Sequence, residues 1–403
     1  LRCGGTRYGA RGGTMVMGST ADAIGAVVTC TLLLNDSATL ARGKHGLYSQ
    51  DQTGGALKIR GVPRTRNTRL TNATSAGATS ITVDNSTNWA VGDQIVIASD
   101  TDDPARAQVV TISGGSSPTW TVPAITNARA AGCRVGNLSS NVTIRPSGGA
   151  AYTSFVSTLV AQADTTAEID VGDVRFEEMG SATGWAGVQA NYRAYGLSLS
   201  APSVPAAKFS VSRVAIYNTS TAANVGQPVG LGSPSLEANV LSDFAVYAPN
   251  ATVVYVAGGS NATFDGVIYS SNTAVQSANG DGSAYGRFSG DYYSSATNLS
   301  ATPIIAGEIV ADMRCAAGRT LIIGNGSAQI TGAYISAPLL AVSGAVGATH
   351  VCSYRNCTFG PATLSASLTT GSRPSQQAKH VLTGVNGDAS DNRVLSYFQT
   401  TVT

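Results

Sequence analysis

Short β-branched and aromatic runs, each ended by Gly, Asn, Asp or Ser, recur along the chain of 403 residues. Helical periodicity is almost absent, and this punctuation is typical of an all-β protein. In the second half the runs repeat: FAVY, GVIY, GDYY, GAYI and NCTF end at Tyr247, Tyr269, Tyr293, Ile335 and Phe359. The steps are 22, 24, 42 and 24 residues, and the long step divides in two if ADMRC (residues 311–315) is a further copy.

A period of 20–24 residues with two or three short strands per copy predicts a solenoid. It favours a right-handed parallel β-helix over a leucine-rich repeat, because the Leu/Asn ladder of the latter is missing. Strands of successive coils would stack about 4.8 Å apart, with apolar ladders inside and hydroxyls outside. We therefore predict a β-helix over residues 151–403, with coils of 20–24 residues. The five residues at the ends of the repeated runs should stack at equivalent positions.

Residues 1–150 follow another pattern. Five of their motifs, in order, are GGTMVMG (12–18), GGALKIRGVPR (54–64), AGATSITV (76–83), NWAVGDQIVIAS (88–99) and GNLSSNVTI (136–144). Over residues 12–145, about a third of the chain, they resemble the eight-glycine domain of the cell-migration-inducing hyaluronidase and polyductin-like proteins. The resemblance implies a small β-rich domain, incomplete at its N-terminus, that precedes and caps a right-handed parallel β-helix. The chain then reads as part of a longer product.

The segment NWAVGDQIVIAS is interpreted as a tight turn into a strand. Gly92 makes the turn, Asp93 accepts backbone N–H groups, and Trp89 packs beneath. Asp100, Asp102 and Asp103 follow in the loop before Pro104, and these three acids are the alternative candidate for a Ca²⁺ site, which needs several converging oxygens. A solvated turn is the simpler interpretation, so no metal ligand is assigned.

Candidate catalytic groups do not form a recognisable constellation. Where enzymes of the resembling family carry two His residues, this chain has Tyr195 and Leu197. Its three histidines, His45, His350 and His380, are scattered, which predicts no imidazole pair on neighbouring rungs. Three acid pairs are candidates, Glu177 with Glu178, Asp170 with Asp173, and Asp281 with Asp291, and none has a spacing that makes two carboxyls face each other. No catalytic or cofactor-binding residue is assigned.

The charge distribution and the cysteines add no assigned functional residue. Charged residues are 12% of the chain, about half the usual share. Residues 1–70 hold ten Lys or Arg against three Asp, a net +7, which suits an acidic glycan, a neighbouring subunit or, most simply, a solvated face. The basic residues are dispersed and follow no nucleic-acid motif, and no apolar run is long enough to span a membrane. Six cysteines permit but do not require disulfides, and Cys352, Cys357 and His350 are a weak metal candidate.

Two function classes remain. The first is a non-enzymatic structural or adhesive β-helix module of a virion (a phage fibre, spike or decoration) or of an extracellular surface assembly. Such a module self-associates or joins other subunits, and it contacts surface polysaccharide. The alternative is a secreted polysaccharide-degrading enzyme, hyaluronidase-like or lyase-like. Low charge and the missing His pair favour the first class and a location on the virion surface or outside the cell.

Overall fold

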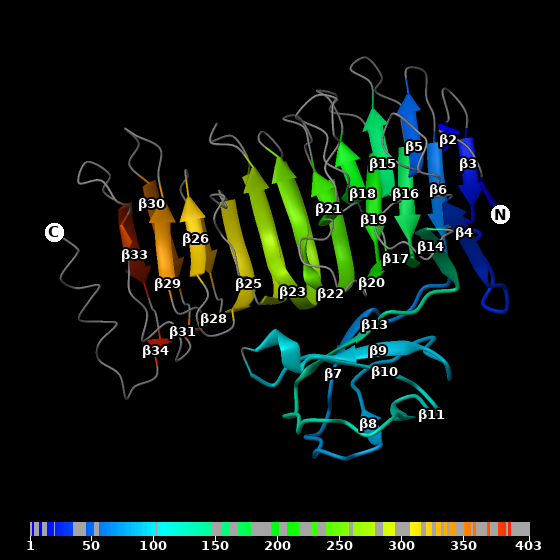
Figure 1. Ribbon diagram of the computed structural model, residues 1–403, viewed down its shortest axis with the longest axis horizontal. Coiled ribbons are helices and arrows are strands. Elements are labelled where there is room, and N and C mark those ends of the chain that lie inside the picture. Colours follow the sequence, from blue (N-terminus) through cyan, green and yellow to red (C-terminus); the bar gives the residue numbers. More distant parts are fainter. Residues whose placement is uncertain are drawn as a thin grey trace.

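The chain is described here from a computed structural model, which is almost entirely β-structure (Figure 1). No helix among the described residues is long and apolar enough to cross a membrane. The described residues are 2–3, 8–9, 14–19, 21–34, 46–51, 56–101, 103–146, 155–160, 168–178, 195–200, 208–217, 227–231, 239–257, 261–278, 285–294, 307–315, 320–324, 328–331, 334–336, 339–343, 350–355, 358–359, 369–370, 378–383 and 386–387.

Parallel strands form three long ladders, and consecutive strands of the chain belong to different ladders. The first ladder contains β1 (Arg2–Cys3), β4 (Cys30–Leu34), β14 (Val142–Pro146), β17 (Val174–Glu177), β20 (Ala215–Tyr217), β28 (Tyr334–Ser336), β31 (Thr358–Phe359) and β34 (Asn386–Gly387). The second contains β2 (Tyr8–Gly9), β5 (Gly46–Asp51), β15 (Phe155–Val160), β18 (Tyr195–Ser200) and β21 (Gln227–Leu231).

The third ladder contains β3 (Thr14–Met17), β6 (Ala56–Arg60), β16 (Glu168–Gly172), β19 (Lys208–Ser212), β27 (Ala328–Thr331), β30 (His350–Arg355) and β33 (Ala378–Thr383). Long strands join these ladders: β22 (Asn239–Ala257), β23 (Asn261–Ala278), β24 (Tyr285–Ser294) and β25 (Gly307–Cys315). A separate parallel sheet contains β26 (Thr320–Gly324), β29 (Leu339–Ser343) and β32 (Thr369–Thr370). Stacked coils of this kind define a parallel β-helix, which confirms the predicted fold class.

Apolar residues occupy the same register position coil after coil. One column of the first ladder contains Leu32, Ile144, Phe176, Ile216, Val246, Ile268, Tyr292, Met313, Ile335 and Phe359. The members from Leu32 to Tyr292 are at most 2% exposed. A column of the third ladder contains Met17, Ile59, Val171, Val211, Leu241, Phe264, Phe288, Ile309, Ile330, Tyr354 and Leu382. These ladders bury apolar surface along the β-helix, which is the main contribution to its stability.

The predicted repeat is present, but its register is shifted. Ile335 and Phe359 belong to the apolar column of the first ladder as expected, and the column continues through Met313, Tyr292, Ile268 and Val246. The predicted positions Tyr247, Tyr269 and Tyr293 are each wrong by one residue, and the last residue of ADMRC is wrong by two. The prediction failed because the tyrosines are bulky and β-prone, and a period alone does not tell which face of a strand a residue occupies.

A second unit is inserted into the β-helix between β6 and β14. Residues 62–140, here called the inserted module, form two antiparallel sheets. The first contains β7 (Asn67–Arg69), β9 (Gln94–Ile97), β10 (Gln108–Thr111) and β13 (Arg134–Asn137). The second contains β8 (Ser80–Thr82), β11 (Gly114–Ser116) and β12 (Thr119–Thr121), and a short 3-10 helix, η1 (Pro104–Arg106), precedes β10.

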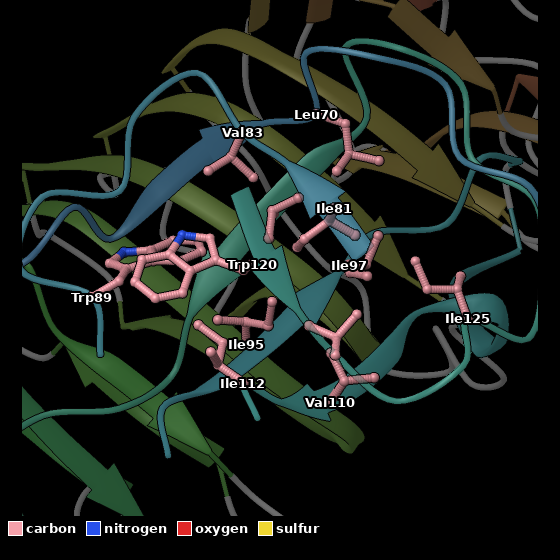
Figure 2. Close-up of a cluster of buried hydrophobic side chains, with 12 residues drawn as sticks. Leu70, Ile81, Val83, Trp89, Ile95, Ile97, Val110, Ile112, Trp120 and Ile125 are labelled. Carbon is pink, nitrogen blue, oxygen red and sulfur yellow. The ribbon is translucent and has the colours of Figure 1, made fainter. Parts of the chain in front are cut away.

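The inserted module has a hydrophobic core of its own. Buried Leu, Ile, Val and Trp side chains converge from both sheets, and Trp89 lies beside Trp120 with ring centroids 6.3 Å apart (Figure 2). Trp89 is 6% exposed, and its indole N–H donates to the Thr65 carbonyl at 2.7 Å. Gly92 adopts φ +94°, and Asp93 accepts the Ala90 N–H at 3.0 Å. The interpretation of this segment as a turn into a strand, with Trp89 beneath it, is confirmed.

The small β domain and the β-helix are not divided by a single boundary near residue 150, as the sequence predicted. Strands β3 to β6 pair in parallel with each other or with β14 to β16, so residues before 61 contribute coils to the β-helix. The ends of the inserted module meet, because the Val62 N–H donates to Asn141 Oδ1 at 2.8 Å. The sequence pattern assigns the motifs on both sides of this insertion to a single domain, because a linear pattern does not mark where the chain leaves a coil and returns to it.

Candidate functional site

The inserted module lies on the outer side of the first ladder (Figure 1), and a cluster of buried side chains from both joins them. Tyr269 is fully buried there, and its hydroxyl donates to Asn67 Oδ1 at 3.0 Å. Tyr293 is 4% exposed, and Tyr217 and Tyr247 are partly buried against the same cluster, with Val96, Ala98, Ala107, Leu138, Ala245 and Val267. The recurring tyrosines of the sequence are therefore a docking surface for the module rather than a ladder inside the β-helix.

Arg66 joins the module to a corner of the β-helix. Its side chain is fully buried, and Nη1 donates to the carbonyls of Asn137 and Ser139 at 2.7 Å each. Nε and Nη2 donate to the Arg213 carbonyl at 3.2 and 3.0 Å. Burial lowers the pKa of Arg66 to about 10, and nearby Asp173 acts in the opposite direction. Because the guanidinium stays charged at neutral pH, its bonds to carbonyls are of the strong, charge-assisted kind.

Other arginines pair with carboxylates along the same junction. Arg134 and Arg69 reach Asp291, the second at 3.8 Å. Within the module, Arg64 pairs with Asp93, which also accepts the Asn137 side-chain amide at 2.9 Å. The pairs with Asp291 bring together residues from distant parts of the chain.

A similar cluster lies at the corner where the third ladder turns into the first. Arg60 bonds to Asp170, and Arg213 donates from Nε and Nη2 to the two carboxylate oxygens of Asp173 at 2.8 Å each. Arg60 and Arg66 are buried, so the interpretation of the basic front end as a solvated face is wrong for these residues. The sequence showed the charge excess but not the acids, far along the chain, that compensate it.

A half-exposed column runs along one edge of the docking surface. Glu177, Tyr217 and Tyr247 occupy equivalent positions on successive coils, and the two tyrosine rings stack with centroids 6.1 Å apart. The Arg175 guanidinium lies 4.6 Å from the centroid of the Tyr217 ring, and its Nε forms an ion pair with Glu177 Oε2 at 3.2 Å. Burial raises the pKa of both tyrosines, so their hydroxyls remain protonated at neutral pH. This polar–aromatic strip offers hydroxyl and carboxylate groups of the kind that bind sugar hydroxyls.

The acids after β9 are committed to protein partners. Asp100 pairs with Arg106 at 3.1 Å and with Arg129 at 3.3 Å. Asp103 caps η1 by accepting the Ala105 N–H at 2.9 Å. Asp102 lies outside the described residues. Asp100 and Asp103 are both exposed, which agrees with the solvated turn expected from the sequence, and Arg106 and Arg129 fold back onto Asp100.

Most acids of the other candidate pairs also contact arginine side chains. Asp170 and Asp173 do approach one another, but around Arg60. Glu177 bonds Arg175, while Glu178 follows at a corner with φ +52°. Asp281 lies outside the described residues, and Asp291 is held by the module.

The prediction of no imidazole pair stays a prediction, although the backbone brings two histidines onto neighbouring rungs. Strands β30 and β33 are adjacent, with His350 opposite Ala378 and Cys352 opposite His380, so the two histidines are offset by two residues in the register. Cys357 and His45 lie outside the described residues. Of the cysteines whose side chains are described, Cys30 is a free thiol, and Cys133 donates to the Ala98 carbonyl at 3.4 Å.

Comparisons with known proteins give distant similarities only. No family model matches the chain, and no curated protein matches it. Among solved structures, the chain is similar to the gp54 tailspike of Acinetobacter baumannii bacteriophage AP22, solved with a capsular saccharide of A. baumannii, at 12% identity and a TM-score of 0.25. That match covers 95% of this chain and 64% of the tailspike, so the chain spans less than two thirds of that protein.

Two further similarities are to tailspikes of Pseudomonas phages. For gp61 of phage phi297 the identity is 12% and the TM-score 0.21, with 90% of this chain and 73% of that chain covered. For gp49 of phage LKA1 the values are 13% and 0.23, with 96% and 71% covered. The hyaluronidase-like resemblance stays a prediction. The class of protein is defined by the strand pairings: a parallel β-helix with an inserted antiparallel module docked on its side.

Proposed function

We propose that this chain is a non-enzymatic structural and adhesive β-helix module of a virion fibre, spike or decoration, or of another extracellular surface assembly. The observation that carries the proposal is the pairing of acids with arginines. Six described carboxylates, those of Asp93, Asp100, Asp170, Asp173, Asp291 and Glu177, each form an ion pair with Arg. Glycoside hydrolysis needs an acid and a partner carboxylate about 5–10 Å apart, one with a raised pKa. Carboxylates held in ion pairs by guanidinium groups stabilise the fold rather than act as catalytic acids.

The register of the second ladder supports the adhesive part of the proposal. One column contains Leu47, Val156, Leu197, Val229, Val254 and Val275. The next column, on the opposite side of the sheet because strand residues alternate, contains Tyr48, Ser157, Ser198, Gly230, Tyr255 and Gln276. A long face with hydroxyl and amide residues suits lateral packing between subunits and weak, repeated contacts with a polysaccharide.

The test is to incubate the purified chain with hyaluronan, pectin, alginate and host surface polysaccharide and to assay new reducing ends and unsaturated uronates. We expect no turnover but measurable retention on surfaces densely coated with polysaccharide. Turnover that is abolished in Glu177→Gln and kept in the matched Asp103→Asn variant would overturn the proposal in favour of a polysaccharide-degrading enzyme.

Oligosaccharide binding at the polar–aromatic strip is tested with a separate variant. Tyr247→Phe removes one hydroxyl and keeps the ring stack, so retention of a monovalent oligosaccharide should weaken by about threefold, the value of one net hydrogen bond. Unchanged affinity in this variant would place the contact on another face.

A further inference from the structure

We propose that the inserted module fixes the register of the β-helix at the point where the length of its coils changes. Before this point the coils are long, since Arg175 pairs with Ala215 and Ala215 pairs with Ala245. After it they are clearly shorter, since Ala245 pairs with Val267 and Val267 pairs with Asp291. The inference is independent of the proposed function.

The change of coil length coincides with irregular strand pairing. The ladder between β22 and β23 contains register shifts between Ser242 and Phe244, between Val246 and Tyr247, and between Ala248 and Thr252. A slip by one residue would move every side chain of a strand to the other face, so a pairing with several irregularities needs an additional constraint on its register. The residues of the inserted module supply contacts at this place.

Asn67 of the module bridges the two irregular strands. Its side-chain N–H groups donate to Asp243 Oδ1 at 2.8 Å and to the Phe244 carbonyl at 3.0 Å, both on β22. Its oxygen accepts the Tyr269 hydroxyl of β23. One side chain therefore bonds to both strands across the first register shift, and each of its bonds is made only in the native register.

Contacts on either side extend this constraint over neighbouring coils. Arg175 of β17 donates to Gln94 Oε1 at 2.7 Å and to the Leu138 carbonyl at 3.1 Å. Arg66 bonds the corner at Arg213 before β20, and Arg134 bonds Asp291 on β24. From β17 to β24 the module thus makes a polar contact with each successive coil.

A close approach of backbone to side chain allows this docking. A Cβ atom at Gly136 would lie 2.5 Å from the Tyr269 ring, well below van der Waals contact. Gly136→Ala therefore separates the module from β23 at this point. Gly114→Ala is the matched control, because a Cβ at Gly114 meets only the Thr121 side chain at an ordinary 3.6 Å.

The experiment is hydrogen exchange of the full chain, read by mass spectrometry over residues 239–294. In Gly136→Ala and in Asn67→Ala we expect exchange at least about tenfold faster in β22, β23 and β24, the effect of losing about one charge-assisted hydrogen bond. Gly114→Ala should leave these strands unchanged.

Exchange that stays at the wild-type rate in β22 to β24 would overturn the inference, whether or not the module core still protects β9 and β12. Equal acceleration in Gly114→Ala would overturn it as well, because the effect would then not arise at the docking surface. Faster exchange in Gly136→Ala and Asn67→Ala, but not in Gly114→Ala, supports the role of the module in fixing the register, even if the module core also loosens.

Discussion

Trp89 shows how a single residue stabilises the inserted module. It is 6% exposed, packs beside Trp120 and bonds the Thr65 carbonyl. Trp89→Ala removes this packing and leaves a cavity, so the free energy of unfolding should fall by about 3–5 kcal/mol. Urea denaturation measures the effect, with the 60% exposed Val91→Ala as the control. A stability within about 1 kcal/mol of wild type would show that the core of the module rearranges around the gap.

Asp243 gives a pH-dependent test at the same scale. Burial raises its pKa above the ordinary carboxyl value, while Asn67, Arg66 and Arg213 lower it and Asp265 raises it. The folded chain therefore holds this proton more tightly than the unfolded chain. By linkage, stability from this group is greatest below the unfolded pKa of about 3.9 and declines as pH rises through the raised folded value.

Asp243→Asn should remove that decline. Asn keeps an oxygen that accepts the Asn67 bond, and it tolerates the φ of +49° found here. Denaturation midpoints of the variant, compared with wild type across pH 3 to 7, should show a smaller loss of stability with rising pH. A parallel pair of pH curves would mean that Asp243 titrates alike in the folded and unfolded chain.

At the scale of an element, β23 and β24 approach each other closely at paired glycines. Gly266 lies opposite Gly290, whose φ is +114°, and a Cβ at Gly290 would lie 1.8 Å from the Gly266 carbonyl oxygen. Gly290→Ala must therefore separate two strands, and we expect a loss of soluble protein or of several kcal/mol of stability.

Gly77→Ala is its matched control. Gly77 also has a positive φ, +83°, but a Cβ there meets nothing within 4 Å. This variant should lose only the conformational term, about 1–2 kcal/mol. Equal losses in the two variants, measured by thermal unfolding, would mean that the backbone conformation and not the strand contact decides the effect at Gly290.

At the scale of the whole molecule, the continuous columns predict that a coil can be removed as a unit. Met313 pairs with Ile335, so deleting residues 313–334 removes one coil and lets Ile335 take the place of Met313 opposite Tyr292. Solenoid stability is a sum over neighbouring coils, so the shortened chain should fold with an unchanged circular dichroism shape and a modestly lower Tm.

Deleting only residues 313–323 is the control for that experiment. It shifts every later strand out of its column, and we expect insoluble protein. A half-coil deletion that folds as well as the full-coil deletion would contradict the idea that these columns set the register.

The sequence by itself determined the fold class and the period of the coils after β22. Runs of β-branched and aromatic residues at steps of 22 and 24 match the coil lengths there, and Ile335 and Phe359 fall in the apolar column of the first ladder as predicted. The longer coils before β22 were not predicted. The turn at Gly92 could also be predicted from the sequence, because the φ of Gly92 and the hydrogen bond from Ala90 to Asp93 involve neighbouring residues only.

Only the tertiary structure decided how the module sits on the β-helix. Tyr269 and Tyr292 are both apolar enough to be buried, and the side to which each points depends on whether another layer covers the outer face. Arg66 and Asp291 become docking residues through partners 147 and 157 residues away in the chain. Ion pairs and hydrogen bonds act over a few ångströms in space, so a charge excess in a sequence does not identify the groups that will compensate it.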